Sequence, residues 1–235
     1  MPQAAADPAT PLPPPAADAR GQRQRAVADA KRALVLDAAR AAFFELGLEG
    51  ASLREIAKRA GYTPGAIYSY FASKEEVYGA LLGESLERLN ARIEAACAGA
   101  SGGGDAARLR ASAGAFFDFY RENPRDLDLG FYLFQGMQPR GLTPELNERL
   151  NARLRDALTA PQAALQALGM APDAARAEVT GLFAHTVGLL LLSHTGRIRM
   201  FGQASQGLFE TYLEALVARA APALLGLAPA RATPP

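Results

Sequence analysis

One segment of the chain has residue types and spacing that suit hydrogen bonding to a nucleic acid. Thr63 precedes a proline, and the small residues behind it would let backbone N–H groups at a helix start approach DNA closely. Tyr68 carries a hydroxyl that can reach phosphates or base edges, and Lys74 carries a cation at a free helix N-terminus. We therefore expect Tyr68 and Lys74 to contact phosphates. Ile67 and Phe71 are expected to pack the small domain instead.

Two short helices joined by a tight turn are expected to position these residues. Ser52-Leu-Arg-Glu55 is a capping box, in which the serine oxygen accepts a backbone N–H and the glutamate reaches back to the cap. A second capping box, Ser73-Lys-Glu-Glu76, opens a longer helix. With a stop at Gly61, these signals predict helices over 53–60 and 64–71. Such a pair is a helix-turn-helix, whose second helix enters the major groove.

The positive charge of the chain is concentrated around this motif. Residues 20–74 contain ten basic and five acidic residues, a net charge of +5, although the whole chain carries only +1. This asymmetry favours attraction to phosphate where the motif lies. The basic stretch at residues 21–32 is either a solvated lead-in to a helix or a basic arm that touches nucleic acid.

The rest of the chain shows helical periodicity and no sustained alternation typical of strands. A helix is predicted from about residue 29 to the glycines at 47 and 50. Further helices are predicted over 74–98, 105–122, 125–137, 144–168, 172–198 and 203–219. The sequence therefore predicts an all-α protein.

Several short runs together match a known family pattern. They are residues 35–39 (VLDAA), 43–47 (FFELG), 51–57 (ASLREIA), 60–68 (AGYTPGAIY) and 70–75 (YFASKE). With these runs, residues 32–82 resemble the DNA-binding domain of the TetR family of bacterial transcription regulators. The resemblance implies an all-α fold of about nine helices, with a three-helix DNA-binding head, a linking fourth helix and a larger effector-binding and dimerising body.

The same resemblance implies a set of DNA contacts. They are Ser52, Thr63, Pro64, Gly65, Ala66, Tyr68, Ser69 and Lys74. Two positions depart from the family pattern. Ser69 stands where a histidine is frequent, although it keeps a hydroxyl, and Tyr62 replaces the small aliphatic residue common in the turn.

The chain is expected to divide into four segments. Residues 1–28 are read as a disordered Pro/Ala-rich tail with a basic arm, because prolines lack the backbone donor and fix φ. Residues 29–90 would form the DNA-binding domain and residues 91–223 the effector-binding and dimerisation domain. Residues 224–235 would form a flexible C-terminal tail.

Seven aromatic residues lie within 19 positions, between 116 and 134, in a chain that is 8% aromatic. They either fill the core or line an apolar effector pocket between helices. On the second interpretation, the candidate ligand contacts are Phe116, Tyr120, Tyr132, Phe134 and His185. The expected effector is a mid-sized hydrophobic or aromatic small molecule of unknown identity.

Segment 179–196 has 18 residues without a formal charge, the lower limit for a transmembrane helix. Its six polar residues favour a buried helix of a soluble protein over a membrane span. Together with the helix at 203–219, its small residues predict a four-helix homodimer interface. The candidate interface residues are Gly181, Ala184, Val187, Gly188, Leu208, Tyr212 and Leu216. The alternative is a core within one chain.

No pattern indicates catalysis or a bound metal. His185 and His194 are nine positions apart, so they lie on opposite sides of one helix and cannot share a metal ion. The chain contains no nucleophile elbow, zinc-protease motif or phosphate-binding loop. We therefore expect no enzyme activity, no metal and no cofactor. The single cysteine, Cys97, fits the reducing cytoplasm.

The sequence thus predicts a sequence-specific DNA-binding transcription regulator. The leading hypothesis is a homodimeric repressor on a palindromic double-stranded DNA operator, with no membrane partner. A small hydrophobic ligand would release it by shifting the helix at 74–98. One alternative is a constitutive DNA-binding regulator without an effector, and an all-α enzyme is a distant one.

Overall fold

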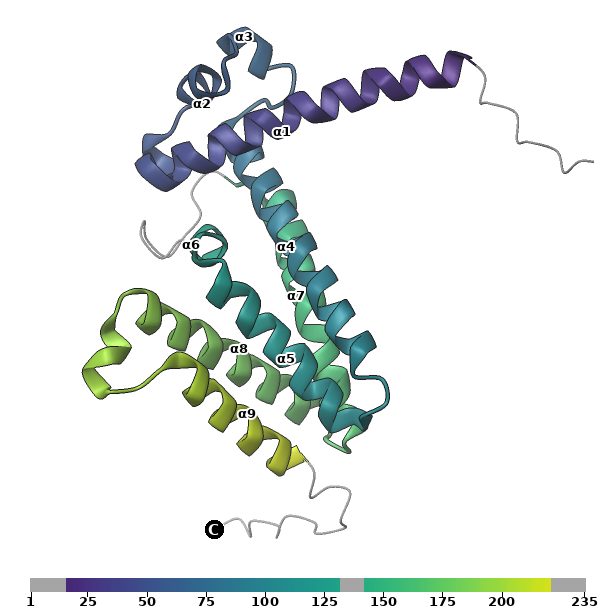
Figure 1. The fold of residues 1–235 in the computed structure, drawn as a ribbon, viewed down its shortest axis with the longest axis vertical. Coiled ribbons are helices and arrows are strands. Elements are labelled where there is room, and N and C mark those ends of the chain that lie inside the picture. The colour runs from purple at the N-terminus through teal and green to yellow at the C-terminus, as the bar shows by residue number, and fades with distance from the viewer. Residues whose placement is uncertain (1–15, 132–141, 221–235) are drawn as a thin grey trace, which may run out of the picture. The chain divides into compact units, whose positions relative to one another are not determined.

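The computed structural model describes residues 16–131 and 142–220 of the chain (Figure 1). Within these ranges the chain forms nine α-helices and one 3-10 helix, and no strand. The predicted all-α class is therefore confirmed. The chain divides into two units, Met1–Lys74 and Glu75–Pro235, which we call the N-terminal unit and the C-terminal unit.

The N-terminal unit is built from α1 (Ala16–Gly50), α2 (Leu53–Ala60) and α3 (Pro64–Ile67). Buried apolar side chains from all three helices form a small core, which also includes one aromatic ring after α3. Its members include Val35, Leu36, Ala39, Ala42, Ile56, Ala57, Ile67 and Phe71. The prediction that Ile67 and Phe71 pack this domain is confirmed.

Helix α1 begins at Ala16, so the prediction that it begins near residue 29 is wrong. The proline-rich run ends at Pro15, and the alanines, arginines and glutamines that follow favour helix. Apolar periodicity cannot reveal this part of the helix, because residues 22–34 are all exposed. The rest of the predicted tails, at 1–15 and 224–235, lies outside the described residues.

Helix α3 ends at Ile67, well before the predicted end near Phe71. The chain then turns, and the Tyr70 N–H donates to the Ile67 carbonyl at 2.8 Å. The Ser69 hydroxyl donates to the Ala66 carbonyl at 2.6 Å. This side-chain bond takes an acceptor that a continuing helix would use, so it favours the early end.

The C-terminal unit contains the remaining helices. They are α4 (Lys74–Gly99), which starts at the last residue of the N-terminal unit, α5 (Gly104–Glu122), α6 (Pro124–Phe131), α7 (Pro144–Ala167), α8 (Pro172–His194), the 3-10 helix η1 (Arg197–Phe201) and α9 (Ser205–Ala220). Helix α8 ends before the predicted residue 198, because Gly196 adopts a left-handed φ of 72°. The predicted end of the helix at 125–137 lies outside the described residues.

Helix α5 is the central helix of the C-terminal unit, in contact with α6, α7, α8 and α9 (Figure 1). Its buried face carries four aromatic side chains, each at most 3% exposed: Phe116, Phe117, Phe119 and Tyr120. Phe117 stacks on Phe209 of α9 with 4.2 Å between the ring centroids. Most of the aromatic segment within the described residues is therefore core packing.

Candidate DNA-binding surface and candidate effector cavity

The helix-turn-helix is held by the two caps that the sequence predicts. The Oγ of Ser52 accepts a hydrogen bond from the Glu55 N–H at 3.2 Å. The Oγ1 of Thr63 accepts one from the Ala66 N–H at 3.3 Å. Between the helices, Gly61 adopts a left-handed φ of 73° that closes α2. Local bonds within this short stretch therefore set the start of α3.

The predicted DNA contacts around α3 lie on the surface of the N-terminal unit. Six of them are exposed: Ser52, Thr63, Pro64, Gly65, Tyr68 and Ser69. Tyr68 is 57% exposed, which is high for an aromatic side chain, whereas its neighbour Ile67 is fully buried. Ala66 is half-buried. The residues from Thr63 to Ser69, which we call the α3 surface, thus present hydroxyls and small side chains outward, as contact with a DNA groove requires.

Basic side chains on α2 fall into two groups. Arg59 lies 2.8 Å from the Glu45 carboxylate and 2.8 Å from that of Glu55, so it joins α1 to α2. The hydrogen bond from Arg59 lowers the pKa of Glu55, and the same bond raises the pKa of Arg59. Arg54 and Lys58 are exposed and form no ion pair within the described residues. These two are not among the DNA contacts predicted from the sequence, although their four-residue spacing puts them on one helix face.

Lys74 has a structural contact that its sequence position does not reveal. Its ammonium donates to the Leu48 carbonyl at 2.8 Å and to the Glu49 carbonyl at 3.4 Å. These carbonyls follow Gly47, whose φ of 73° breaks the regular course of α1. Lys74 therefore caps the end of α1 with two of its three N–H donors. Its contact with phosphate stays a prediction.

A cavity of about 260 Å³ lies within the C-terminal unit, between α4, α5, α6 and α7. Half of its lining residues are leucines, and the others are a tyrosine, a phenylalanine, a glycine and two asparagines: Leu82, Leu86, Tyr120, Gly130, Phe131, Leu142, Asn147, Leu150, Asn151 and Leu154. A Cβ at Gly130 would lie 3.8 Å from the Leu82 Cδ1 and 4.0 Å from the Tyr120 Oη. An apolar lining with a few polar groups is typical of small-molecule sites.

Tyr120 brings a deeply buried polar group to this cavity. Its side chain is 1% exposed. Burial raises the pKa of its phenol far above the ordinary value, and the Asp126 carboxylate adds to the shift. No hydrogen bond from its hydroxyl is found among the described residues. The hydroxyl is therefore neutral, and Tyr120 belongs to the lining of the cavity.

The other predicted ligand contacts do not gather at this cavity. Phe116 packs in the core, with its ring centroid 5.2 Å from that of Tyr120, and does not line the cavity. His185 instead stacks on Tyr212 of α9 at 4.1 Å, and burial lowers its pKa. Neither residue lines this cavity, and their contact with a ligand stays a prediction. Two further candidates lie outside the described residues: Tyr132 and Phe134.

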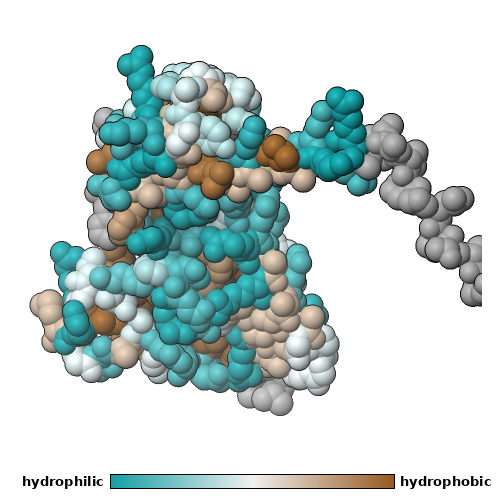
Figure 2. All heavy atoms as spheres, turned by 45° about the horizontal axis from the view of Figure 1, so that its top comes forward, coloured by the Kyte–Doolittle hydropathy of each residue, from teal (hydrophilic) through white to brown (hydrophobic). Residues whose placement is uncertain are grey.

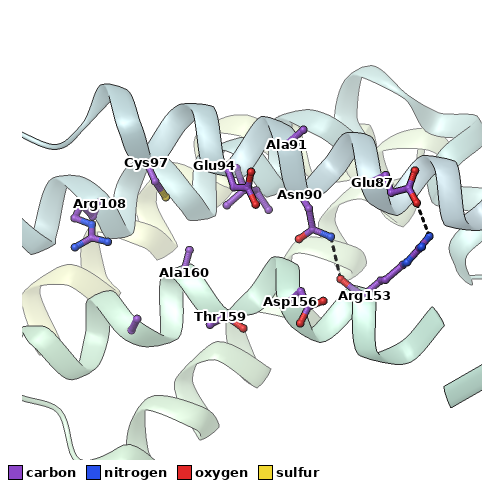
Figure 3. Close-up of a pocket in the computed structure, with 12 residues that line it drawn as sticks. Glu87, Asn90, Ala91, Glu94, Cys97, Arg108, Arg153, Asp156, Thr159 and Ala160 are labelled. Atoms are coloured by element: carbon purple, nitrogen blue, oxygen red, sulfur yellow. Dashed lines mark hydrogen bonds and ion pairs between the residues drawn. The ribbon is translucent and has the colours of Figure 1, made fainter. Parts of the chain in front are cut away.

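A second, open groove of about 700 Å³ lies between α4, α5 and α7 (Figure 3). Its charged side chains are three carboxylates and two guanidiniums: Glu87, Glu94, Asp156, Arg108 and Arg153. Arg153 pairs with Glu87 at 2.8 Å, and the Asn90 amide donates to the Arg153 carbonyl at 3.1 Å (Figure 3). The charged side chains of this groove are therefore, on balance, negative.

Helix α8 is long and apolar enough to cross a membrane by length and composition alone, yet 33% of its most apolar window is buried within the chain. Most predicted interface residues are exposed or half-buried: Gly181, Ala184, Val187, Gly188, Leu208 and Tyr212. Leu216 is fully buried in the chain's own core, so its assignment to an interface is wrong. The other six form what we call the α8–α9 face, in which Ala184 is exposed and the other five residues are half-buried in the single chain.

The two histidines do not form a metal site together. His185 is half-buried on α8, and His194 is exposed at the end of that helix. Within the described ranges, no group of three or more His, Cys, Asp or Glu side chains could hold a metal ion.

Comparisons with known proteins show which proteins resemble this chain. Residues 35–81 match the family of bacterial regulatory proteins, tetR family. The transcriptional activator FasR of Mycolicibacterium smegmatis is 34% identical over 103 residues, which cover 44% of this chain and 46% of FasR. The transcriptional repressor KstR2 of Mycobacterium tuberculosis is 42% identical over 64 residues, 27% of this chain and 32% of KstR2. The match thus spans less than half the length of these two relatives.

A third relative matches over a longer stretch of the chain. The transcriptional regulator BetI of Yersinia pestis is 32% identical over 149 residues, which cover 60% of this chain and 75% of BetI. Among solved structures, FadR of Bacillus subtilis in complex with stearoyl-CoA has a TM-score of 0.61 at 21% identity, covering 79% of this chain and 97% of FadR. A TetR family regulator from Marinobacter aquaeolei has a TM-score of 0.60 at 22% identity, covering 86% and 97%. At these identities the solved structures show the fold.

Proposed function

Because the chain belongs to the TetR family of bacterial regulatory proteins, we propose that it is a homodimeric DNA-binding repressor that a small apolar molecule releases from its operator. One observation carries this proposal: an exposed helix-turn-helix surface and an apolar cavity lie in different units of one chain, and α4 runs from one unit into the other. The relatives include an activator and a repressor by name, so the direction of regulation is part of what is proposed.

The DNA-binding step is assigned to the α3 surface. Its hydroxyls and small residues enter a major groove, while Arg54 and Lys58 on α2 contact phosphates. Phosphate contacts, including one from the exposed Tyr68 hydroxyl, supply affinity that does not depend on sequence, and the exposed Thr63 supplies contacts near base edges. A two-fold dimer presents two such surfaces to half-sites about 34–36 Å apart.

The dimer is assigned to the α8–α9 face. Only 33% of the apolar window of α8 is buried within the chain, and most of its other residues are half-buried, so a partner would complete their burial. No atom lies within 4 Å of where a Cβ of Gly188 would be, so a second helix can approach closely there. Gly181 is already in use within the chain, since a Cβ there would lie 3.2 Å from the Tyr212 Oη. In the cytoplasm, this helix serves as an interface rather than a membrane span.

The effector is assigned to the 260 Å³ cavity. Its leucines favour an apolar molecule, and the Tyr120 hydroxyl and the two asparagine amides offer hydrogen bonds that fix its orientation. FadR was solved with stearoyl-CoA, but the open groove of this chain has three carboxylates and only two guanidiniums. Such a groove is a poor site for the phosphates of coenzyme A. The proposed effector is therefore an apolar molecule without a polyphosphate group.

Release from DNA is assigned to α4. Leu82 and Leu86 of α4 line the cavity, and Lys74 at the start of the same helix caps the end of α1. A ligand that moves α4 by its contacts with these leucines also acts on Lys74, and through Lys74 on the end of α1 that it caps. The ligand must bind the released form more tightly, because only differential affinity shifts an equilibrium.

The proposal is tested by selecting, from fragmented genomic DNA of the source organism, the fragments that the full chain binds. We expect a footprint with two-fold symmetry, and we expect apolar compounds that raise the melting temperature to weaken binding. Sugars, nucleotides and metal salts should do neither. Specific binding that no stabilising compound weakens would support the constitutive alternative, and failure to select any fragment would contradict the proposal.

A further inference from the structure

We propose that the first part of α1 is a helical arm that contacts DNA phosphates beyond the footprint of the α3 surface. The arm consists of residues 20–34, and we call it the basic extension. The inference rests on the proposed function, because it needs a duplex held by the N-terminal unit. It adds a second DNA-binding element, which the family match over residues 35–81 does not include.

No side chain of the basic extension is buried in its own unit. Residues 22–34 are all exposed, and burial begins abruptly at Val35. The first part of α1 extends away from α2 and α3 (Figure 1). At 1.5 Å per residue, the 15 residues from 20 to 34 extend about 22 Å from the core of the N-terminal unit. A helix of this length with no apolar packing is marginal in water, so a binding partner would stabilise it.

The charge of the extension identifies the chemistry of that partner. It contains five basic residues and one acidic residue, Asp29, a net charge of +4, against +1 for the whole chain. The basic residues are Arg20, Arg23, Arg25, Lys31 and Arg32, all exposed, and the surface of this region is mostly hydrophilic (Figure 2). Arg20 and Lys31 are about three turns apart and Arg25 and Arg32 about two, so two helix faces carry charge along their length. Such an array fits a polyanion.

The place where the extension leaves the core puts this array beside the DNA-binding motif. The Arg32 guanidinium lies over the Phe71 ring, 5.3 Å from its centroid. The Phe71 N–H in turn donates to the carbonyl of Ile67, the last residue of α3, at 3.0 Å. The extension therefore starts next to the end of α3. A duplex that takes α3 into a groove brings its neighbouring phosphates near the extension.

The apolar content of the extension is too small for a protein partner. Its exposed large apolar side chains are Val27 and Leu34, each 54% exposed and seven residues apart. A coiled coil with a second copy would need apolar residues at two positions of every heptad over several heptads. DNA is therefore the occupant that this surface fits.

The test compares two triple variants of the full chain that remove the same charge. Arg20, Arg25 and Lys31 are changed to Gln in one, which keeps helix propensity high. Arg155, Arg176 and Arg197, exposed residues of the C-terminal unit, are changed to Gln in the control. Fluorescence anisotropy gives affinities for duplexes of about 20 and about 40 bp, two and four helical turns, over a series of salt concentrations. Each duplex is prepared with a selected operator and with mixed sequence.

We expect the extension variant to lose affinity on both sequences. Its salt slope should fall by about 0.9 for each phosphate contact removed, and its gain from the longer duplex should disappear. The control should match the wild type. If the wild type binds the duplexes and both variants have equal salt slopes and affinities, this inference is overturned and the proposed function still stands. A change in solution mass instead of DNA affinity would also overturn it, and failure of the wild type to bind any duplex would overturn both.

Discussion

The two units of this protein keep their functional groups in different ways. In the N-terminal unit, the α3 surface is continuous in sequence and exposed, and nearby caps at Ser52 and Thr63 set it. In the C-terminal unit, the cavity is lined by residues from Leu82 to Leu154, which only the packed fold brings together. A surface for binding DNA can be formed by residues close together in the sequence, whereas a cavity for a small molecule depends on the whole core around it.

The largest effect is expected from a change that prevents formation of the proposed dimer. Gly188→Arg should bury an unpaired charge in the α8–α9 face. In other proteins, a buried charge left without its partner costs about 3–5 kcal/mol of stability. We expect monomers at micromolar concentration by light scattering and operator affinity reduced at least about tenfold, since 1.4 kcal/mol is a factor of ten. Gly99→Arg, at an exposed glycine with open space around it, is the control and should remain dimeric. A dimeric Gly188→Arg variant would refute the assigned interface.

The next largest effect is expected from a change in the cavity, which should remove ligand binding and leave DNA binding unchanged. Gly130→Leu places a side chain toward Leu82 and Tyr120 and fills the cavity. We expect the loss of all thermal stabilisation by the compound that stabilises the wild type, about 2.7 kcal/mol at a hundred times its Kd. Operator affinity without the compound should stay as in the wild type. If the compound still stabilises this variant, it binds somewhere other than the cavity.

Lys74 offers a smaller test, at the junction of the units. Lys74→Ala removes two hydrogen bonds to the end of α1, each worth about 1 kcal/mol. We expect a lower melting temperature as well as weaker DNA binding. Lys58→Ala, a change at an exposed lysine of α2, should weaken DNA binding with little effect on melting. Equal melting temperatures for the two variants would show that the contact with α1 contributes nothing.

The smallest expected effect concerns one hydroxyl of the α3 surface. Tyr68→Phe removes the hydroxyl of a residue that is 57% exposed and leaves the buried core intact. We expect operator affinity to fall up to about tenfold, since a single hydrogen bond contributes about 0.5–1.5 kcal/mol, with the melting temperature unchanged. Scrambled DNA should lose affinity to the same degree, because a phosphate contact carries no sequence information. Full retention of affinity on both sequences would remove Tyr68 from the contacts.

What the sequence predicts well in this chain is what local chemistry determines. Helix α2 spans the predicted residues 53–60 because Ser52 caps its start and Gly61 takes the left-handed φ that ends it. The start of α1 was missed because a fully exposed helix has no apolar periodicity to read. The end of α3 was missed because the Ser69 hydroxyl competes for a backbone acceptor.

The remaining errors concern contacts between distant parts of the chain. Tyr120 was a predicted ligand contact and lines the cavity, but its aromatic neighbour Phe116 turns into the core. Leu216 shares a helix stripe with Tyr212, yet it is fully buried within its own chain. Periodicity shows which residues share a helix face, but not whether that face meets the same chain or a partner.

The most direct test of the account is the operator affinity of the wild-type dimer, measured with and without a compound that raises its melting temperature. A ligand in the C-terminal unit and DNA on the N-terminal unit should oppose each other, because binding free energies are linked reciprocally. We predict that the compound weakens operator binding by about 5- to 150-fold, the usual range for coupled sites, and that operator DNA weakens compound binding by the same factor. Affinity that is the same with and without a saturating compound would contradict the account.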